Sequence, residues 1–325
     1  MADPAVDVTG LAKRFGQVMA LDGIDFEVPA GTVFGLLGPN GAGKTTAVRV
    51  LTTIIAPDRG SARVLGYDVV READVVRLNI GLAGQSAAVD TNLTGAENLR
   101  LIGRLAQMPR SEILSRALDL LRRFDLVDAA DRPVRTYSGG MRRRLDVAAS
   151  LVHRPPVLFL DEPTTGLDLQ SRGELWQMIR ELVADGTTVL LTTQYLEEAD
   201  RLADRLAVID HGKVIAEGSP AELKARLGAT VIELGFGDHQ DRAERATEIL
   251  AGLPDLAPER TQDTVRLTSP DGSRILVDVL RALDSDEVSP NTVAVREPSL
   301  DDVFLALTGH RAEHQTATTQ QGGQS

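Results

Sequence analysis

The chain has 325 residues, of which 42% are hydrophobic and none is cysteine. This length predicts one large domain with a substantial buried core and a smaller second domain. Without cysteine the chain has neither a disulfide framework nor a thiolate metal site, as expected for a reducing compartment. A net charge of -12 argues against sequence-independent binding of DNA or RNA. There is neither an apolar run of about 18 residues nor an N-terminal basic segment followed by an apolar stretch, so we expect a soluble protein.

The first predicted elements are strands. Alternating apolar and polar residues at 6–15 and 24–28, with turn residues between them, predict an antiparallel pair. The apolar run 33–37 predicts a buried strand that leads directly into a glycine-rich loop. A further strand is predicted at 62–66. The chain therefore begins with a β-rich part around one buried strand.

The loop after residue 37 matches the phosphate-binding pattern G-x-x-x-x-G-K-[ST] at every fixed position. Its glycines let backbone N–H groups turn toward a polyphosphate, and a helix predicted over 45–53 adds its positive dipole end. Lys44 would reach the β- and γ-phosphates of ATP, and the Thr45 hydroxyl would bind Mg²⁺. A plain glycine-rich turn is the alternative, but it does not explain why strand, loop and Lys-Thr occur in this order. The predicted phosphate-binding residues are Gly38, Pro39, Asn40, Gly41, Ala42, Gly43, Lys44, Thr45 and Thr46.

Helical periodicity dominates from residue 94 to about 152. Thr94 and Glu97 have the spacing of a capping box, which predicts a helix start. Leu114, Leu118 and Leu121 recur at i, i+4 and i+7 and predict the apolar face of a second helix. We expect a mainly helical insert at this point of the α/β domain.

Two short apolar runs, 157–160 and 188–192, predict buried parallel strands, with a helix over 171–184 between them. They complete a doubly wound α/β core. The first strand ends in Asp161 and Glu162, at the edge where open α/β sheets bind ligands. Asp161 would hold Mg²⁺, and Glu162 would act as the general base that polarises the attacking water. Taken alone an apolar strand ending in Asp-Glu is often a turn, but its place downstream of the phosphate loop favours function.

Beyond residue 228 the pattern changes to that of a small α+β appendage. Strands are predicted at 230–236, 264–268 and 292–296, and helices around 241–253 and 274–283. The last helix would begin at Ser299, with Asp302 in capping-box position. We therefore predict an ATP-binding domain over 1–227, a small α+β domain over 228–310 and, because it has no apolar residues to bury, a disordered tail over 311–325.

The segment 137–144, Tyr-Ser-Gly-Gly-Met-Arg-Arg-Arg, precedes a helix with an apolar period. Together with the phosphate loop and the Asp-Glu strand it resembles the ATP-binding subunits of ABC transporters, whose signature is Leu-Ser-Gly-Gly-Gln. The resemblance implies a P-loop NTPase fold with an antiparallel β subdomain, which would cover the base of ATP, and a helical subdomain. It also implies that Ser138, Gly139 and Gly140 contact the γ-phosphate bound by a second, head-to-tail protomer. A helix N-cap without function is the alternative for this segment.

The resemblance covers further positions. Gln85 is similar to the glutamine that touches Mg²⁺ and water, and Asp168 to the aspartate that crosses the dimer interface. Phe15 is similar to the aromatic residue that stacks on adenine, although an edge-strand core residue is an alternative. Gln194 occupies the position where the family usually has a histidine at the γ-phosphate, so it joins Glu162 and Lys44 as a candidate catalytic residue. Its amide cannot exchange a proton near neutral pH, and it could also be an ordinary loop residue.

The Arg-rich signature, Gln194 and the ending 297–310 resemble a narrower group, the daunorubicin-resistance (DrrA-like) ABC ATPases. This implies an ATP- and Mg²⁺-dependent subunit that powers export of hydrophobic drugs or lipids through a separate integral-membrane permease. The expected location is the cytoplasmic face of the membrane. The main alternative is a soluble ABC ATPase that acts on nucleic acid or ribosomes. The single cassette and the short insert argue against it, and intact Lys44, Asp161 and Glu162 argue against a regulator without turnover.

Overall fold

The computed structural model describes residues 3–84, 89–226, 230–237, 239–253, 256, 258–269, 273–286 and 288–308. The chain divides into two compact units, Met1–Glu217 and Gly218–Arg311. The predicted domain ranges 1–227 and 228–310 stay predictions, and the predicted tail over 311–325 lies outside the described residues. Every helix in the described ranges is too short or too polar to span a bilayer.

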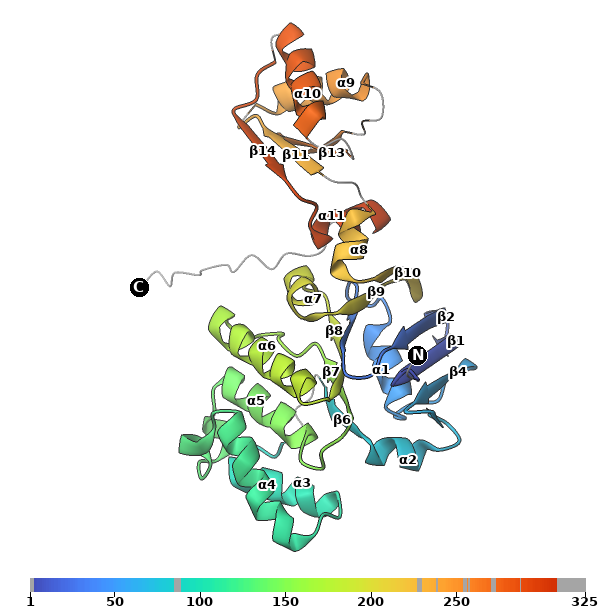
Figure 1. Cartoon of the computed structure of the whole chain (residues 1–325), viewed down its shortest axis with the longest axis vertical. Helices are drawn as coiled ribbons and strands as arrows, with labels where there is room; N and C mark the ends of the chain where they lie inside the picture. Colours follow the sequence, from blue (N-terminus) through green and yellow to red (C-terminus); the bar gives the residue numbers. More distant parts are fainter. Residues whose placement is uncertain are drawn as a thin grey trace. The chain divides into compact units, whose positions relative to one another are not determined.

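A six-stranded sheet forms the centre of the first unit (Figure 1). Its order is β10-β9-β3-β8-β7-β6, and the ladders joining β9, β3, β8, β7 and β6 are all parallel. The strands are β3 (Val33–Leu37), β6 (Ile80–Ala83), β7 (Val157–Asp161), β8 (Thr188–Thr193), β9 (Arg205–Asp210) and β10 (Lys213–Gly218). The predicted parallel core is confirmed, and β9 and β10 extend it beyond the predicted strands.

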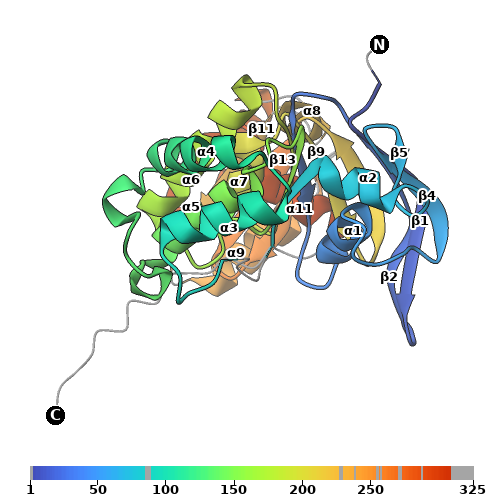
Figure 2. The ribbon, with the colours of Figure 1, turned by 90° about the horizontal axis from the view of Figure 1, so that it is seen from below.

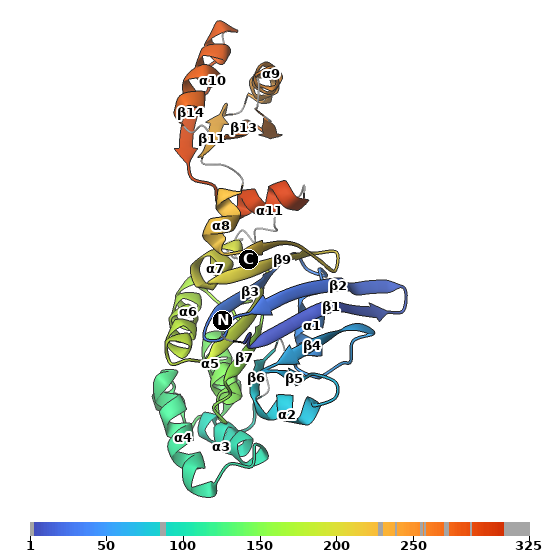
Figure 3. The ribbon, with the colours of Figure 1, turned by 45° about the vertical axis from the view of Figure 1, so that its right-hand side comes forward.

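Both faces of this sheet are buried, as the continuous apolar runs require. On β7, Leu158 and Leu160 point into one core, whereas Val157 and Phe159 point into the other. Helices α5 (Gly139–Ser150) and α6 (Leu169–Ala184) cover the first face, and α1 (Lys44–Leu51) covers the second (Figure 3). The shorter helices α2 (Ala73–Leu78) and α7 (Leu196–Leu202) also pack on this sheet.

A second, antiparallel sheet lies beyond α1, on the side opposite the helices α3 to α6 (Figure 2). Its order is β2-β1-β4-β5, with β1 paired to both β2 and β4. The strands are β1 (Val6–Phe15), β2 (Val18–Val28), β4 (Arg59–Val64) and β5 (Tyr67–Asp68). The predicted antiparallel pair is confirmed, although β2 begins before the predicted start at 24.

The helical insert contains α3 (Gly95–Leu105), α4 (Arg110–Arg123) and α5, with short 3₁₀ turns at Val127–Ala129 and Val134–Thr136. The capping box is confirmed, because Thr94 accepts from the Glu97 N–H and Glu97 accepts from the Thr94 N–H. The predicted apolar face of α4 is wrong in part: Leu121 is buried, but Leu114 and Leu118 are exposed. The face that meets α3 and α5 is instead made of Ile113, Ala117, Leu120 and Leu121. Spacing alone could not separate these two overlapping stripes.

The second unit contains a βαββαβ arrangement with sheet order β12-β13-β11-β14, which is the ferredoxin-like pattern. Ile232, Leu234, Val265 and Leu267 point from the sheet toward the two helices that cover it. Its elements are β11 (Thr230–Gly235), α9 (Gln240–Ala251), β12 (Glu259–Thr261), β13 (Thr264–Ser269), α10 (Ser273–Ser285) and β14 (Thr292–Arg296), flanked by α8 (Pro220–Ala225) and α11 (Leu300–Thr308). All predicted elements are present; β12, with three exposed residues, was not predicted.

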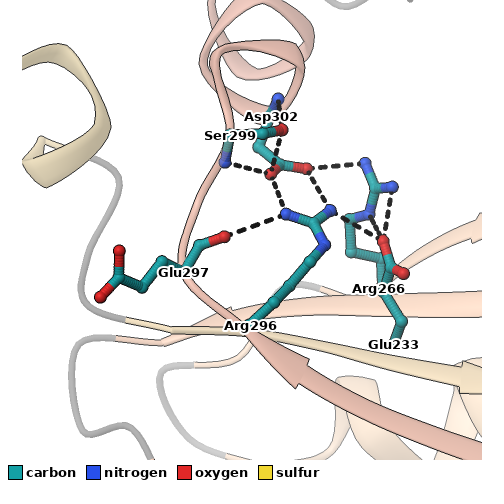
Figure 4. Close-up of polar contacts among 6 residues, drawn as sticks. All are labelled: Glu233, Arg266, Arg296, Glu297, Ser299 and Asp302. Atoms are coloured by element: carbon teal, nitrogen blue, oxygen red, sulfur yellow. Dashed lines mark hydrogen bonds and ion pairs between the residues drawn. The ribbon is translucent and has the colours of Figure 1, made fainter. Parts of the chain in front are cut away.

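Four charged side chains connect α11 to the face of this sheet that the helices α9 and α10 leave uncovered (Figure 4). Asp302 accepts from Arg296 at 2.6 and 3.1 Å and pairs with Arg266 at 2.9 Å; both arginines also bind Glu233. The predicted capping box is confirmed, because Asp302 accepts from the Ser299 N–H at 2.7 Å. Burial disfavours the charged carboxylate, but the hydrogen bonds from Arg296 and Ser299 outweigh it and lower the pKa of Asp302 to about 2.

We expect Asp302→Asn to loosen α11. Lowering the pKa from 3.8 to about 2 corresponds to about 2 kcal/mol of stability, present above pH 3.8 and lost as the pH falls toward 2. Hydrogen exchange of α11 amides in the full chain at pH 7 should accelerate roughly 30-fold. Asp278→Asn, which removes the exposed pair between Asp278 and Arg281, is the control and should change exchange little. Equal exchange rates in Asp302→Asn and the parent would contradict the role of the cluster.

Candidate active site

The candidate site lies where three neighbouring parallel strands end. β8 pairs with β3 on one side and with β7 on the other, so their carboxyl ends meet at one edge of the sheet. The phosphate-binding loop follows β3, Asp161 ends β7, and Gln194 follows β8. A hydrogen bond from the Gly38 N–H to the Thr193 carbonyl, 3.2 Å, joins the loop to β8.

The loop 38–43 requires glycine at two positions, Gly38 and Gly43. Gly43 is the N-cap of α1 and has φ 113°, a left-handed conformation that favours glycine. A β-carbon on Gly43 would clash with the carbonyl oxygen of Ala20, and one on Gly38 would clash with that of Ile209. The backbone can therefore turn tightly at the start of α1, where N–H groups are free of intrahelical partners.

Lys44, the first residue of α1, is buried within this turn, with 4% of its surface exposed. Its ammonium donates to the carbonyls of Gly38 at 2.8 Å and Pro39 at 3.0 Å, and it lies 3.6 Å from Glu162 Oε1. Burial lowers the pKa of Lys44, while the negative charges of Glu162 and Asp161 oppose that change. The predicted lysine and the predicted general base are thus in direct electrostatic contact.

Asp161 is buried at the centre of a small hydrogen-bond network. Its Oδ1 accepts from Thr192 Oγ1 at 2.6 Å and from Thr45 Oγ1 at 3.2 Å. Thr192 Oγ1 in turn accepts from the Glu162 N–H at 3.0 Å. Hydroxyl and carboxylate oxygens are the ligands that Mg²⁺ prefers, so Thr45 and Asp161 form a suitable donor set.

Glu162 has φ 50°, an uncommon left-handed conformation for a residue with a side chain. Such backbone conformations cost about 1–3 kcal/mol and persist where surrounding contacts fix them. A cavity of about 480 Å³ borders Glu162 and reaches Gly139 at the start of α5 and Gly166 in the following loop. The geometry therefore directs Glu162 toward both the phosphate loop and the signature segment.

The signature segment forms the start of α5. Ser138 is the N-cap of α5, and its side chain accepts from the Met141 N–H at 3.2 Å. The helix N-cap that was the alternative for this segment is therefore present. Ser138 and Gly139 are nonetheless exposed, which leaves this helix start accessible. Asp168 caps α6 in the same way, accepts from the Ser171 N–H at 2.8 Å and is exposed. The contacts of Ser138, Gly139 and Asp168 with ATP or across the dimer interface stay predictions.

Three predicted site residues remain: Phe15, Gln194 and Gln85. Phe15 ends β1 and is 47% exposed, so the alternative of a buried core residue is wrong. Gln194 is half-buried in the turn between β8 and α7. Gln85 lies outside the described residues. The adenine contact of Phe15 and the roles of the two glutamines stay predictions.

Comparisons with known proteins agree with this geometry. The family model of the ABC transporter matches residues 21–165, and that of the ATP-binding protein DrrA1-3-like C-terminal domain matches 218–308. The daunorubicin resistance ATP-binding protein DrrA2 of Streptomyces coeruleorubidus is 53% identical over 96% of this chain and 98% of its own. The chain belongs to the DrrA-type ABC ATP-binding proteins. It is therefore an ATPase of the P-loop, ABC cassette fold, and the predicted family and fold are confirmed.

The chain is also similar to an export ATP-binding protein and to a solved ABC cassette. Nod factor export ATP-binding protein I of Ralstonia nicotianae is 42% identical over 94% of this chain and 94% of its own. The dimeric, post-hydrolysis structure of the cassette MJ0796 bound to ADP and Pi has a TM-score of 0.60 and 25% identity, and it covers 66% of this chain and 98% of that one. The similarity to the DrrA-type and export proteins thus extends over both units, whereas the similarity to the solved cassette covers two thirds of the chain.

Two site residues of this DrrA-type ATPase were not predicted. The Thr192 hydroxyl donates to the Asp161 carboxylate and accepts from the Glu162 N–H. The sequence feature that could have indicated it is a hydroxyl residue near the end of a buried strand. Arg143 is a mostly buried arginine that donates to the carbonyls of Gly84, directly after β6, and of Asp161, at the end of β7. Nothing in a run of three arginines indicates which one turns inward, so this residue could not be selected from the sequence.

Proposed function

We propose that this ATPase powers an exporter of hydrophobic drugs or lipids and associates with a separate permease at the cytoplasmic face of the membrane. The observation that carries the catalytic part is the convergence of Lys44, Thr45, Asp161 and Glu162 at one sheet edge. The names of the relatives, drug resistance and export, support the transport part over an action on nucleic acid or ribosomes. ABC ATP-binding subunits work with separate membrane components, which supports the permease as partner.

ATP would bind with its phosphates in the loop 38–46, where backbone N–H groups and the Lys44 ammonium face the β- and γ-phosphates. Thr45, Asp161 and Gln85 would hold Mg²⁺, which neutralises phosphate charge. Glu162 would accept a proton from the attacking water as the bond between the γ-phosphorus and the bridging oxygen breaks, so that ADP and phosphate form. The contact between Lys44 and Glu162 supports this arrangement, since it orients the carboxylate toward the phosphate loop.

Each complete site would be formed by two chains. In this proposal Ser138, Gly139 and Gly140 of one copy close over the γ-phosphate held by the other, with Asp168 at the interface. Two observations support it: the exposed start of α5 and the dimer found for the similar cassette bound to ADP and Pi. A helix start with free N–H groups is suited to bind an anion.

Gln194 would donate a hydrogen bond to the γ-phosphate or hold the attacking water without exchanging a proton. We expect Gln194→Ala to lower kcat on the order of 10²-fold, because a transition-state donor is lost. Gln194→His should retain substantial activity and acquire a pH dependence near about 6.5. Gln177→Ala, on the exposed face of α6, is the control and should behave like the parent. Parent-like rates in Gln194→Ala would assign the residue to loop structure alone.

The transport part is tested by isolating the chain with its membrane partner. The tagged chain is purified from detergent-solubilised membranes, and the proteins that accompany it are identified. We expect an integral-membrane protein which, reconstituted with the chain in vesicles, moves a fluorescent anthracycline in the presence of ATP but not with Lys44→Ala. Co-isolation with ribosomes or nucleic acid, and no transport in vesicles, would contradict the proposal.

A further inference from the structure

Arg143 lies on α5, one turn beyond the N-cap Ser138, and its side chain is 13% exposed. Its guanidinium donates to three backbone carbonyls: Nη1 to Gly84 at 2.6 Å, Nη2 to Asp161 at 3.1 Å and Nε to Pro163 at 2.8 Å. Nη1 also pairs with Asp146 at 3.3 Å. One side chain thus joins the helix of the signature segment to the ends of β6 and β7.

Two of these carbonyls lie on either side of Glu162. Asp161 precedes it and Pro163 follows it, so the guanidinium binds the backbone immediately before and immediately after the candidate base. Glu162 is the residue with φ 50°. A left-handed backbone persists only when neighbouring contacts fix it. The two hydrogen bonds from Arg143 act here together with the one from the Glu162 N–H to Thr192 Oγ1.

The chemistry requires arginine specifically. A guanidinium is planar and carries five N–H donors in a fixed fork, so it can reach separate carbonyls at the same time. The ammonium of lysine is a single point with three donors and cannot span the carbonyls of Gly84, Asp161 and Pro163 together. Burying a charge is costly unless it is paired, and Asp146, which is 1% exposed, supplies the opposite charge.

We infer that Arg143 is a positioning residue for ATP hydrolysis, which holds Glu162 in its catalytic orientation by fixing the turn 161–163 to α5. This inference rests on the proposed role of Glu162 as the general base. It adds a connection within one chain between the turn that carries Glu162 and the helix that begins with Ser138.

The test compares Arg143→Met with Arg116→Met. Arg116 is a matched control, because it is also partly buried and donates to backbone carbonyls at the other end of α5, Leu151 at 2.6 Å and Val152 at 3.2 Å. Each variant loses a partly buried guanidinium that donates to backbone carbonyls, from α5 in Arg143→Met and from α4 in Arg116→Met. We expect similar decreases in Tm, but a kcat reduced on the order of 10²-fold in Arg143→Met alone, with the KM for ATP little changed. Arg143→Lys should fold and show an intermediate kcat, which keeps the test decisive if the methionine variant is unstable.

Glu162→Gln is measured in parallel to separate two kinds of failure. If Glu162→Gln is inactive while Arg143→Met and Arg143→Lys turn over at the parental kcat, the inference fails and the proposed base stands. An equal loss of kcat in Arg116→Met and Arg143→Met would show a general structural effect and would also overturn the inference. If Glu162→Gln hydrolyses ATP at the parental rate, the proposed base fails and the inference falls with it.

Discussion

Replacing Lys44 with alanine is expected to reduce ATP hydrolysis by at least about 10³-fold and to weaken ATP binding. The Lys44 ammonium donates to the carbonyls of Gly38 and Pro39 in the phosphate loop and lies 3.6 Å from Glu162 Oε1. Its loss removes the positive charge that faces the β- and γ-phosphates and that lies 3.6 Å from the Glu162 carboxylate. Steady-state hydrolysis and photolabelling with an ATP analogue measure the two effects.

Lys213→Ala is the matched control for Lys44→Ala. Lys213 also pairs with a carboxylate, that of Asp22 at 3.3 Å, but its side chain is 62% exposed. An exposed pair of this kind contributes little, so Lys213→Ala should hydrolyse ATP like the parent. Hydrolysis by Lys44→Ala at the parental rate would show that the phosphate loop has been assigned wrongly.

Replacing Glu162 with glutamine is expected to stop hydrolysis while preserving ATP binding. The amide keeps the shape of the side chain but cannot accept the proton of the attacking water. Bound ATP would then persist and hold two chains together, so size-exclusion chromatography with Mg²⁺ and ATP should show a dimer. Without nucleotide the same variant should elute as a monomer.

Glu181→Gln provides the comparison for this second prediction. Glu181 lies on the exposed surface of α6, where its carboxylate accepts from Gln177 at 3.2 Å. The change in charge and size is identical, but no contact with ATP is proposed for this residue. Full turnover in Glu162→Gln would exclude it as the base, and a monomer in Mg²⁺ and ATP at every protein concentration would count against the two-chain site.

The local parts of the site could be predicted from the sequence because each is encoded in one short segment. The phosphate loop needs glycines followed by Lys44, and the carboxylates need a buried strand that ends at Asp161. Both are set by backbone geometry within about ten residues. The fold class follows similarly, since continuous apolar runs indicate strands buried on both faces.

The parts that could not be predicted depend on neighbours distant in the sequence. The contact between Lys44 and Glu162 exists because β3 and β7 both lie beside β8, and strand order is not encoded in either segment. The side chain of Arg143 is buried because the carbonyls of Gly84 and Asp161, which are distant in the sequence, lie within hydrogen-bond distance of it. On α4, Leu114 and Leu118 satisfy a helical period, yet the packing of α3 and α5 selects the adjacent stripe.

The two-chain site is tested most directly by the ATPase activity of mixed dimers isolated with two affinity tags. In one dimer the first chain carries Lys44→Ala and the second carries Ser138→Arg. In the other dimer one chain carries both changes and its partner carries neither. If each site is formed by two chains, the first dimer has one intact site and hydrolyses ATP, whereas the second has a defect in both sites and is inactive. The reverse pattern, an inactive first dimer and an active second one, would show that each chain forms its own site and would contradict the account.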